Sequence, residues 1–196
     1  MLTESAWTAP IVWAVLYCSD YSMTIRCARM YGMQDKIRFQ GSYEITPIFQ
    51  ADVNALRRVS PRFLAILLAS TIYVLFLGMT LQATEFHALY LFAVGALILI
   101  QLTVHVRHFR NWFLFRSALA AQGLTGRLEY GRDVVLRASA FELVEFALLY
   151  ALIFVMTPAG PFVLGGAFAC GLLSLNHYRL ARQQVRAVES SQTKES

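Results

Sequence analysis

The residues best suited to chemistry are a few ionisable side chains inside long apolar stretches. Asp20, His105, Glu142, Glu145 and His177 each lie within eight residues of the arginine nearest the end of the stretch. Charged groups inside an apolar span are costly and normally face the interior of a helix bundle. At about 1.5 Å per residue, the pattern predicts that all of them lie within roughly 12 Å of one membrane edge.

Two of these stretches carry pairs of residues three positions apart, which places both side chains on one side of a helix. The pairs are His105 with His108 and Glu142 with Glu145. Imidazole and carboxylate groups on facing helices suit zinc or another divalent metal, so these four residues are a candidate ligand set. The same groups suit proton transfer or the binding of a transported cation, and no tight motif such as HExxH decides between them.

Further polar residues extend the candidate site at the same membrane edge. Thr24 lies one helical turn beyond the aspartate, and Asn176 lies beside the last histidine. Arg107 and Arg110 lie among the histidines and are suited to binding the phosphate of a lipid headgroup.

Structural ion pairs are the simpler explanation of the same side chains. Glu142 would pair with Arg107 or Arg137, and Asp20 would pair with Arg26 or Arg29. The histidines would then extend to the interface beside arginines. A shared polar site is favoured because charges within apolar spans are rare.

Five apolar blocks, each near the ~20 residues that cross a bilayer, must position these groups. They cover residues 6–25, 63–83, 86–106, 138–157 and 160–178, in a single membrane domain of residues 1–188. The chain is 57% hydrophobic and only 15% charged, so it has too few polar residues for a soluble domain of this size. The expected fold is therefore all-α, an integral membrane bundle of five transmembrane helices.

The basic residues predict the orientation of this bundle. All 17 Lys and Arg residues lie in segments 26–62, 107–137 and 179–194, which five spans place on one face of the membrane. Cytoplasmic loops carry the Lys and Arg excess, so we expect the N-terminus outside and the C-terminus in the cytoplasm. A cell membrane, the bacterial inner membrane, is the expected location. The basic loops would contact anionic lipid headgroups rather than nucleic acid.

The cytoplasmic segments are expected to contain two interfacial helices and a tail. Residues 48–59 follow Thr46 as a helix N-cap and Pro47 at the first helical position. Residues 108–122 carry aromatic side chains typical of the interface. Residues 189–196 are polar and are predicted to be disordered.

Two short motifs occur in the first third of the chain, Asp20-Tyr-Ser-Met-Thr24 and Glu44-Ile-Thr-Pro47. They resemble the Asp-x-x-x-Thr and Glu-x-Asn-Pro motifs of small bacterial multi-pass membrane proteins of uncharacterised function. Thr46 stands where those proteins have Asn. The resemblance implies that Asp20, Thr24, Glu44 and Pro47 lie together at the cytoplasmic end of the first helix, and it implies no activity.

Three functional hypotheses follow from these patterns. The first is cation- or proton-coupled transport through a cytoplasm-facing polar cavity. Its ligands would be Asp20, His105, Glu142, Glu145 and His177. The second is a membrane-embedded enzyme, with or without a divalent metal, acting on a lipid at the inner leaflet. The third is an accessory subunit of a membrane complex, and self-association into a homo-oligomer is a further alternative.

Overall fold

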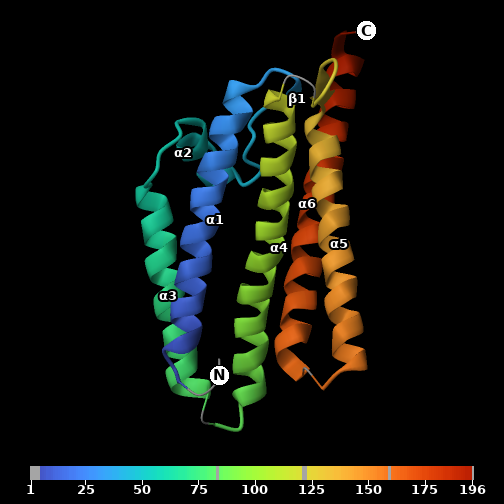
Figure 1. Cartoon of the computed structure of the whole chain (residues 1–196). Coiled ribbons are helices and arrows are strands. Elements are labelled where there is room, and N and C mark those ends of the chain that lie inside the picture. The colour runs from blue at the N-terminus through green and yellow to red at the C-terminus, as the bar shows by residue number, and fades with distance from the viewer. Residues whose placement is uncertain (1–4, 83, 121–122, 159, 196) are drawn as a thin grey trace.

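Five long helices lie side by side in the part of the chain that the structure describes (Figure 1). The structure is a computed structural model that describes residues 5–82, 84–120, 123–158 and 160–195, with side chains described as far as residue 186. The long helices are α1 Thr8–Met33, α3 Pro61–Leu81, α4 His87–Leu119, α5 Arg132–Met156 and α6 Gly160–Glu195. They pack in the spatial order α3, α1, α4, α6, α5 (Figure 1). The prediction of a mostly helical bundle is therefore confirmed.

Three of these helices are long and apolar enough to cross a membrane, namely α3, α4 and α5. Large apolar side chains remain exposed along the surface of α3, including Leu64, Leu68, Ile72, Phe76 and Met79. A continuous apolar face of this extent on a helix is typical of contact with lipid or with another protein. These helices suggest contact with a lipid bilayer.

Glycines allow α4 and α6 to approach closely. A Cβ atom added at Gly95 on α4 would overlap the Phe162 carbonyl oxygen, and one added at Gly165 on α6 would overlap the Phe92 carbonyl oxygen. Small residues at a helix–helix contact let the backbones meet directly, which is a common way of packing helices in membranes. This contact fixes α6 against α4 in the half of the bundle opposite the chain's C-terminus (Figure 1).

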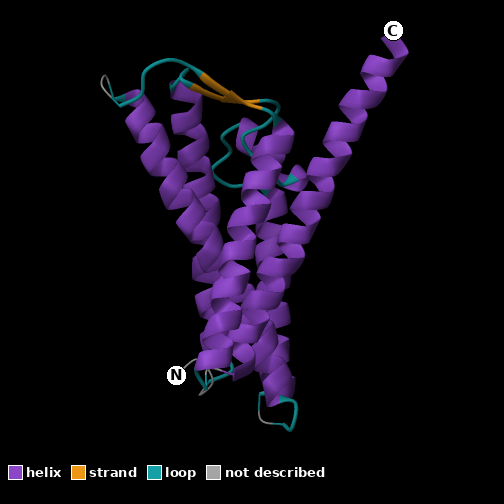
Figure 2. Ribbon diagram, turned by 90° about the vertical axis from the view of Figure 1, so that its right-hand side faces the viewer, coloured by secondary structure: helices purple, strands orange, loops and turns teal. Residues whose placement is uncertain are grey.

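Several short elements gather at the end of the bundle where α1, α4 and α6 finish and α5 begins, which we call the basic end. They are β1 Ile37–Phe39, η1 Pro47–Phe49, α2 Gln50–Asn54 and β2 Leu128–Tyr130. β1 pairs in parallel with β2, with Ile37 opposite Leu128 and Phe39 opposite Tyr130. The helices diverge toward this end, and the loops lie between them (Figure 2).

The two predicted interfacial helices differ from the observed structure. After Thr46, which makes no side-chain cap, the chain forms only η1 and the short α2, because Leu56 adopts a φ of 51° that ends the helix. The predicted helix 108–122 is instead the continuation of α4 to Leu119, with no Gly or Pro after Gly95 to interrupt it. Residues 121–122 lie outside the described residues.

The loop after α2 is closed by a buried carboxylate. Asp52 accepts a hydrogen bond from the Ser60 hydroxyl at 2.7 Å and pairs with Arg57 at 3.2 Å. The same Ser60 hydroxyl accepts from the Phe63 backbone N–H at 3.2 Å, which caps the start of α3. One buried polar cluster therefore ends the loop and starts the next helix.

The last helix is longer than expected. α6 continues to Glu195, past the predicted start of disorder at residue 189. Residues 172–195 contain no Gly or Pro, and many of them have high helix propensity, so no residue type ends the helix earlier.

Candidate functional site

A cavity of about 430 Å³ lies at the basic end of the bundle, a size typical of small-molecule sites. Its walls are mostly apolar and come from four helices: residues 17–24 of α1, 104–114 of α4, 134–142 of α5 and 173–177 of α6. Residues 39–53 cover it. Among the described residues, the lining includes nothing on α4 before Val104, on α5 after Glu142 or on α6 before Leu173, so the cavity stops short of the other end of the bundle and is one-sided.

The cavity brings together eight of the eleven residues predicted for the site. Those that line it are Asp20, Thr24, Glu44, Arg107, His108, Arg110, Glu142 and His177. They come from four helices and one loop, far apart in sequence, because α1, α4, α5 and α6 converge at this end of the bundle.

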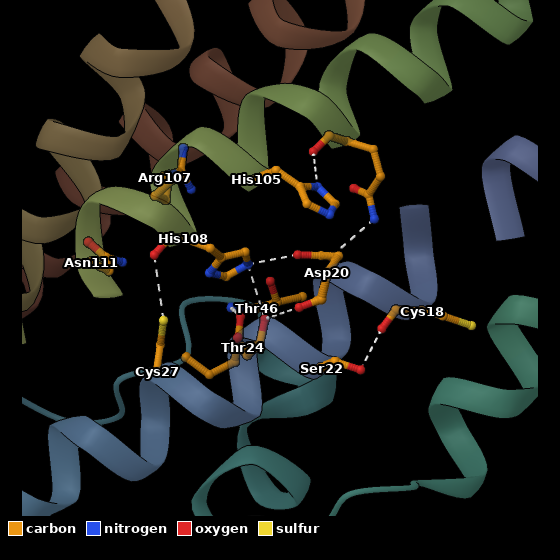
Figure 3. Close-up of polar contacts among 12 residues, drawn as sticks. Cys18, Asp20, Ser22, Thr24, Cys27, Thr46, His105, Arg107, His108 and Asn111 are labelled. Carbon is orange, nitrogen blue, oxygen red and sulfur yellow. Dashed lines mark hydrogen bonds and ion pairs between the residues drawn. The ribbon is translucent and has the colours of Figure 1, made fainter. Parts of the chain in front are cut away.

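Asp20 is held by two groups on α4. Its Oδ1 lies 2.7 Å from Nε2 of His108, and its Oδ2 accepts a hydrogen bond from Nε2 of Gln101 at 3.1 Å (Figure 3). The Asp20 side chain still exposes 21% of its surface. Because each oxygen of the carboxylate has a hydrogen-bond partner, the orientation of the carboxylate is fixed, and each oxygen keeps a lone pair for a ligand.

Thr24 fixes the position of the proton on His108. The Thr24 hydroxyl donates to the Asp20 backbone carbonyl at 3.0 Å, so its oxygen can only accept from Nε2 of His108, 3.1 Å away (Figure 3). Both neighbours of Nε2 are then acceptors, which requires the proton on that nitrogen. His108 acts as a buried donor behind the Asp20 carboxylate, and its Nδ1 is buried with no partner among the described side chains.

A second charged cluster joins α4 to α5. Glu142 accepts from Nε of Arg107 at 2.8 Å and pairs with Nη1 of Arg110 at 3.1 Å. Glu142 is buried and Arg107 exposes 12% of its side chain, whereas Arg110 exposes 60%. Nη2 of Arg107 is buried and has no partner in the described part of the chain. The pairing of Glu142 with Arg107 is one of the structural alternatives expected from the sequence.

α6 contributes one histidine to the cavity. Nδ1 of His177 lies 2.8 Å from the Ser139 hydroxyl on α5, and both side chains are buried. This contact orients the ring and connects α5 to α6 next to the arginine cluster.

Glu44 reaches the cavity from the covering loop. Its Oε1 accepts a hydrogen bond from the Thr46 backbone N–H at 2.7 Å, which folds the loop into a tight turn. Burial raises the pKa of Glu44, and the nearby Asp20 carboxylate adds to the rise, while the Thr46 hydrogen bonds and His108 act in the opposite direction. Protonation of Glu44 is therefore easier than that of an exposed glutamate.

Three predicted residues do not line the cavity. Glu145 and Asn176 are exposed, and Nδ1 of His105 contacts the carbonyl of Gln101 in its own helix at 2.7 Å. Each lies one or three positions from a lining residue, and that rotation around the helix carries the side chain away from the cavity.

The candidate metal ligands do not form a cluster. Glu142 is engaged by two arginines, Nδ1 of His105 contacts a carbonyl of its own helix, and Glu145 is exposed. Among the residues the structure describes, no group of three or more His, Cys, Asp or Glu is placed to hold a metal ion. The geometry offers no support for His105, His108, Glu142 and Glu145 as a shared ligand set.

Several lining residues were not identified from the sequence. Ser139 and Asn111 line the cavity, and Gln101 holds Asp20 without lining it. All three are uncharged, so a search for ionisable groups within spans passes over them. Aromatic rings are also prominent in the lining: Tyr17, Tyr21, Phe39, Tyr43, Phe49 and Tyr130. Tyr17 and Tyr21 share a helix face with Asp20 and Thr24, and that spacing is the one signal visible in the sequence.

Comparison with known proteins gives no guidance beyond this geometry. The chain matches no protein-family model, no curated protein and no solved structure. The site must therefore be interpreted from its own chemistry.

Proposed function

We propose that this is a five-span membrane protein with its basic end in the cytoplasm. Besides the three apolar helices, α1 and α6 have 26 and 36 residues and pack in the same bundle. Their lengths, about 39 Å and about 54 Å, are sufficient to cross a bilayer. The confinement of every Lys and Arg to segments 26–62, 107–137 and 179–194 supports this orientation.

We infer that the cavity binds a cation or exchanges a proton at Asp20, as part of cation- or proton-coupled transport. The observation that carries this inference is the Asp20 carboxylate, held by His108 and Gln101 and still exposed in the cavity wall. Carboxylates in the interior of membrane bundles commonly mark ion or proton pathways. The one-sided cavity is consistent with a state open to the cytoplasm.

Charge movement in proteoliposomes tests this proposal. Purified protein is reconstituted and adsorbed on a solid-supported membrane, and transient currents are recorded after jumps in pH, Na⁺, K⁺ or tetramethylammonium. We expect a current in the wild type that is lost in Asp20→Asn and kept in Glu145→Gln, a carboxylate outside the cavity. A wild type without current, or an Asp20→Asn protein with an unchanged one, would refute the proposal.

A membrane-embedded enzyme acting on a lipid at the inner leaflet is the second candidate. The unpartnered Nη2 of Arg107 and the mostly apolar walls favour it, because they fit an anionic headgroup with an acyl chain. Asp20 would then act as a general base. Mass spectrometry of lipids after incubation with the proteoliposomes, together with metal analysis of the purified protein, separates the two candidates. A time-dependent lipid product that needs Asp20 supports the enzyme, and its absence counts against it.

A further inference from the structure

One wall of the cavity carries an excess positive charge. Two guanidinium groups, Arg107 and Arg110, face the single carboxylate of Glu142. One positive charge therefore remains, and the buried Nη2 of Arg107 has no acceptor among the described residues. A buried donor without a partner is unfavourable, so this wall favours an arriving anion.

The opposite wall carries an excess negative charge. Asp20 and Glu44 lie close enough to influence each other, and the only basic group that contacts them in the described part of the chain is His108. Among the described residues, the Glu44 carboxylate accepts a hydrogen bond only from the neighbouring Thr46. One negative charge therefore remains here even when His108 is protonated.

Aromatic rings surround this negative wall. Tyr17 and Tyr21 flank Asp20 on α1, and Tyr43 and Phe49 come from the same loop as Glu44. Rings beside carboxylates attract organic ammonium groups, since the π faces and the carboxylates both favour positive charge. A hydrated metal ion gains less from such apolar surroundings, so the wall favours an amine.

We propose that the cavity binds a zwitterion, with its ammonium group between Asp20 and Glu44 and its phosphate or other anionic group at Arg107 and Arg110. This inference rests on the cation site proposed at Asp20 and adds the class of ligand. With His108 protonated and Glu44 ionised, the charges left on the two walls are opposite in sign, so a zwitterion matches both walls and a simple ion matches only one. The remaining apolar volume can hold the rest of a small molecule or the start of a lipid chain.

Binding is linked to pH through Glu44. Its pKa is raised by burial and by Asp20 on α1, and it also faces His108 on α4. An ammonium group beside Glu44 favours the ionised form, so binding releases a proton. The affinity for the ligand therefore rises as pH increases through the raised pKa of Glu44.

Isothermal titration of the full-length protein in detergent tests the proposal with three probes: ethanolamine, inorganic phosphate and phosphoethanolamine. We expect phosphoethanolamine to bind about tenfold or more tightly than ethanolamine or phosphate, each of which carries charge of one sign only. This is the effect of one additional charged hydrogen bond. Glu44→Gln should weaken the two amine probes and leave phosphate unchanged. Arg110→Gln, at an exposed position less critical for folding, should weaken the two phosphate probes. Glu145→Gln and Arg137→Gln, outside the cavity, are the matched controls.

The outcomes separate this inference from the proposed cation site. If ethanolamine binds in an Asp20-dependent way and phosphoethanolamine binds no tighter, the zwitterion is excluded and the cation site stands. If none of the three probes binds, the zwitterion is excluded, and the current assay alone decides the cation site. When phosphoethanolamine does bind more tightly, phosphatidylglycerol nanodiscs with and without phosphatidylethanolamine identify its source: competition by the lipid indicates a headgroup, and no competition indicates a free zwitterion.

Discussion

Replacing Glu142 with Gln should destabilise the bundle more than any other single loss of charge in the cavity. The Glu142 side chain is 9% exposed, and its partner Arg107 is 12% exposed, so the substitution leaves a buried guanidinium without its carboxylate. Removing one partner of a buried pair costs about 3–5 kcal/mol. The exposed pair with Arg110 adds about 0–1 kcal/mol. Gln still offers an oxygen to Nε of Arg107, so we expect a loss of about 2–3 kcal/mol.

The measurement is reversible unfolding in mixed detergent micelles with increasing SDS, followed by circular dichroism. Glu145→Gln, three residues along the same helix and exposed, is the control and should change the unfolding free energy by less than about 0.5 kcal/mol. The double variant Arg107→Gln with Glu142→Gln should recover part of the lost unfolding free energy, with a coupling energy between the two positions of about 0.5–3 kcal/mol. If the two glutamate variants are equally stable, Glu142 is not a structural partner of Arg107, and the reasoning is wrong.

Three further predictions concern the other elements around the cavity. Gly165→Ala should destabilise the protein by about 1–3 kcal/mol, because the new methyl group meets the backbone of α4. Gly171→Ala is the control: its methyl group has nothing within 4 Å, so the protein should be unchanged or gain up to about 1 kcal/mol from helix propensity. Equal melting temperatures of the two variants would contradict this. Because the pKa of Glu44 is raised in the folded state, its contribution to stability is present at acid pH and is lost as pH rises through that pKa. The melting temperature of Glu44→Gln should lack this decline. Identical pH profiles for the wild type and the variant would mean that Glu44 does not cause the decline. Asp52→Asn should loosen the loop before α3 and speed tryptic cleavage after Arg57, and an unchanged rate would mean that the buried carboxylate does not hold the loop.

From the sequence, one can predict that the polar groups lie at the same end of the bundle, but not which of them contact one another. Asp20 and His108 are 88 positions apart and were placed at the same membrane edge only by their distance from the nearest arginine. That argument needs one coordinate, depth, and depth follows directly from the helical rise. It cannot say which side chains meet, because this depends on the rotation of each helix about its own axis.

The glutamate pair on α5 illustrates this limit. Residues three positions apart differ by about 60° in direction around a helix, which is close enough for both to contact one ligand on a flat face. At a junction of several helices, the same 60° separates the bundle interior from its surface. Glu142 therefore meets Arg107, and Glu145 is exposed.

The short parallel sheet lies beyond what the sequence can reveal. Ile37–Phe39 and Leu128–Tyr130 are three residues each and have no alternation that distinguishes them from loop. Their pairing depends on two loops that meet because α1 and α4 end at the same level. The position of Phe39 and Tyr130 in the cavity wall follows from that pairing and not from local preference.

Packing also indicates which part of the bundle would move if the cavity opened to the other side. The contact of α4 with α6 is made of glycines against backbone, and any sliding there would bring backbone atoms into collision. At the basic end, the contact of α1 with α4 includes the polar contacts of Asp20 with His108 and Gln101. A small apolar cluster of Cys27 with Phe115 and Ala118 adds to it. Hydrogen bonds of this kind can be exchanged for bonds to water or to a ligand at little net cost. A transport cycle would therefore move α1 and α3 against a fixed body of α4, α5 and α6, and the same carboxylate that binds the ligand would hold the two parts together when the ligand is absent.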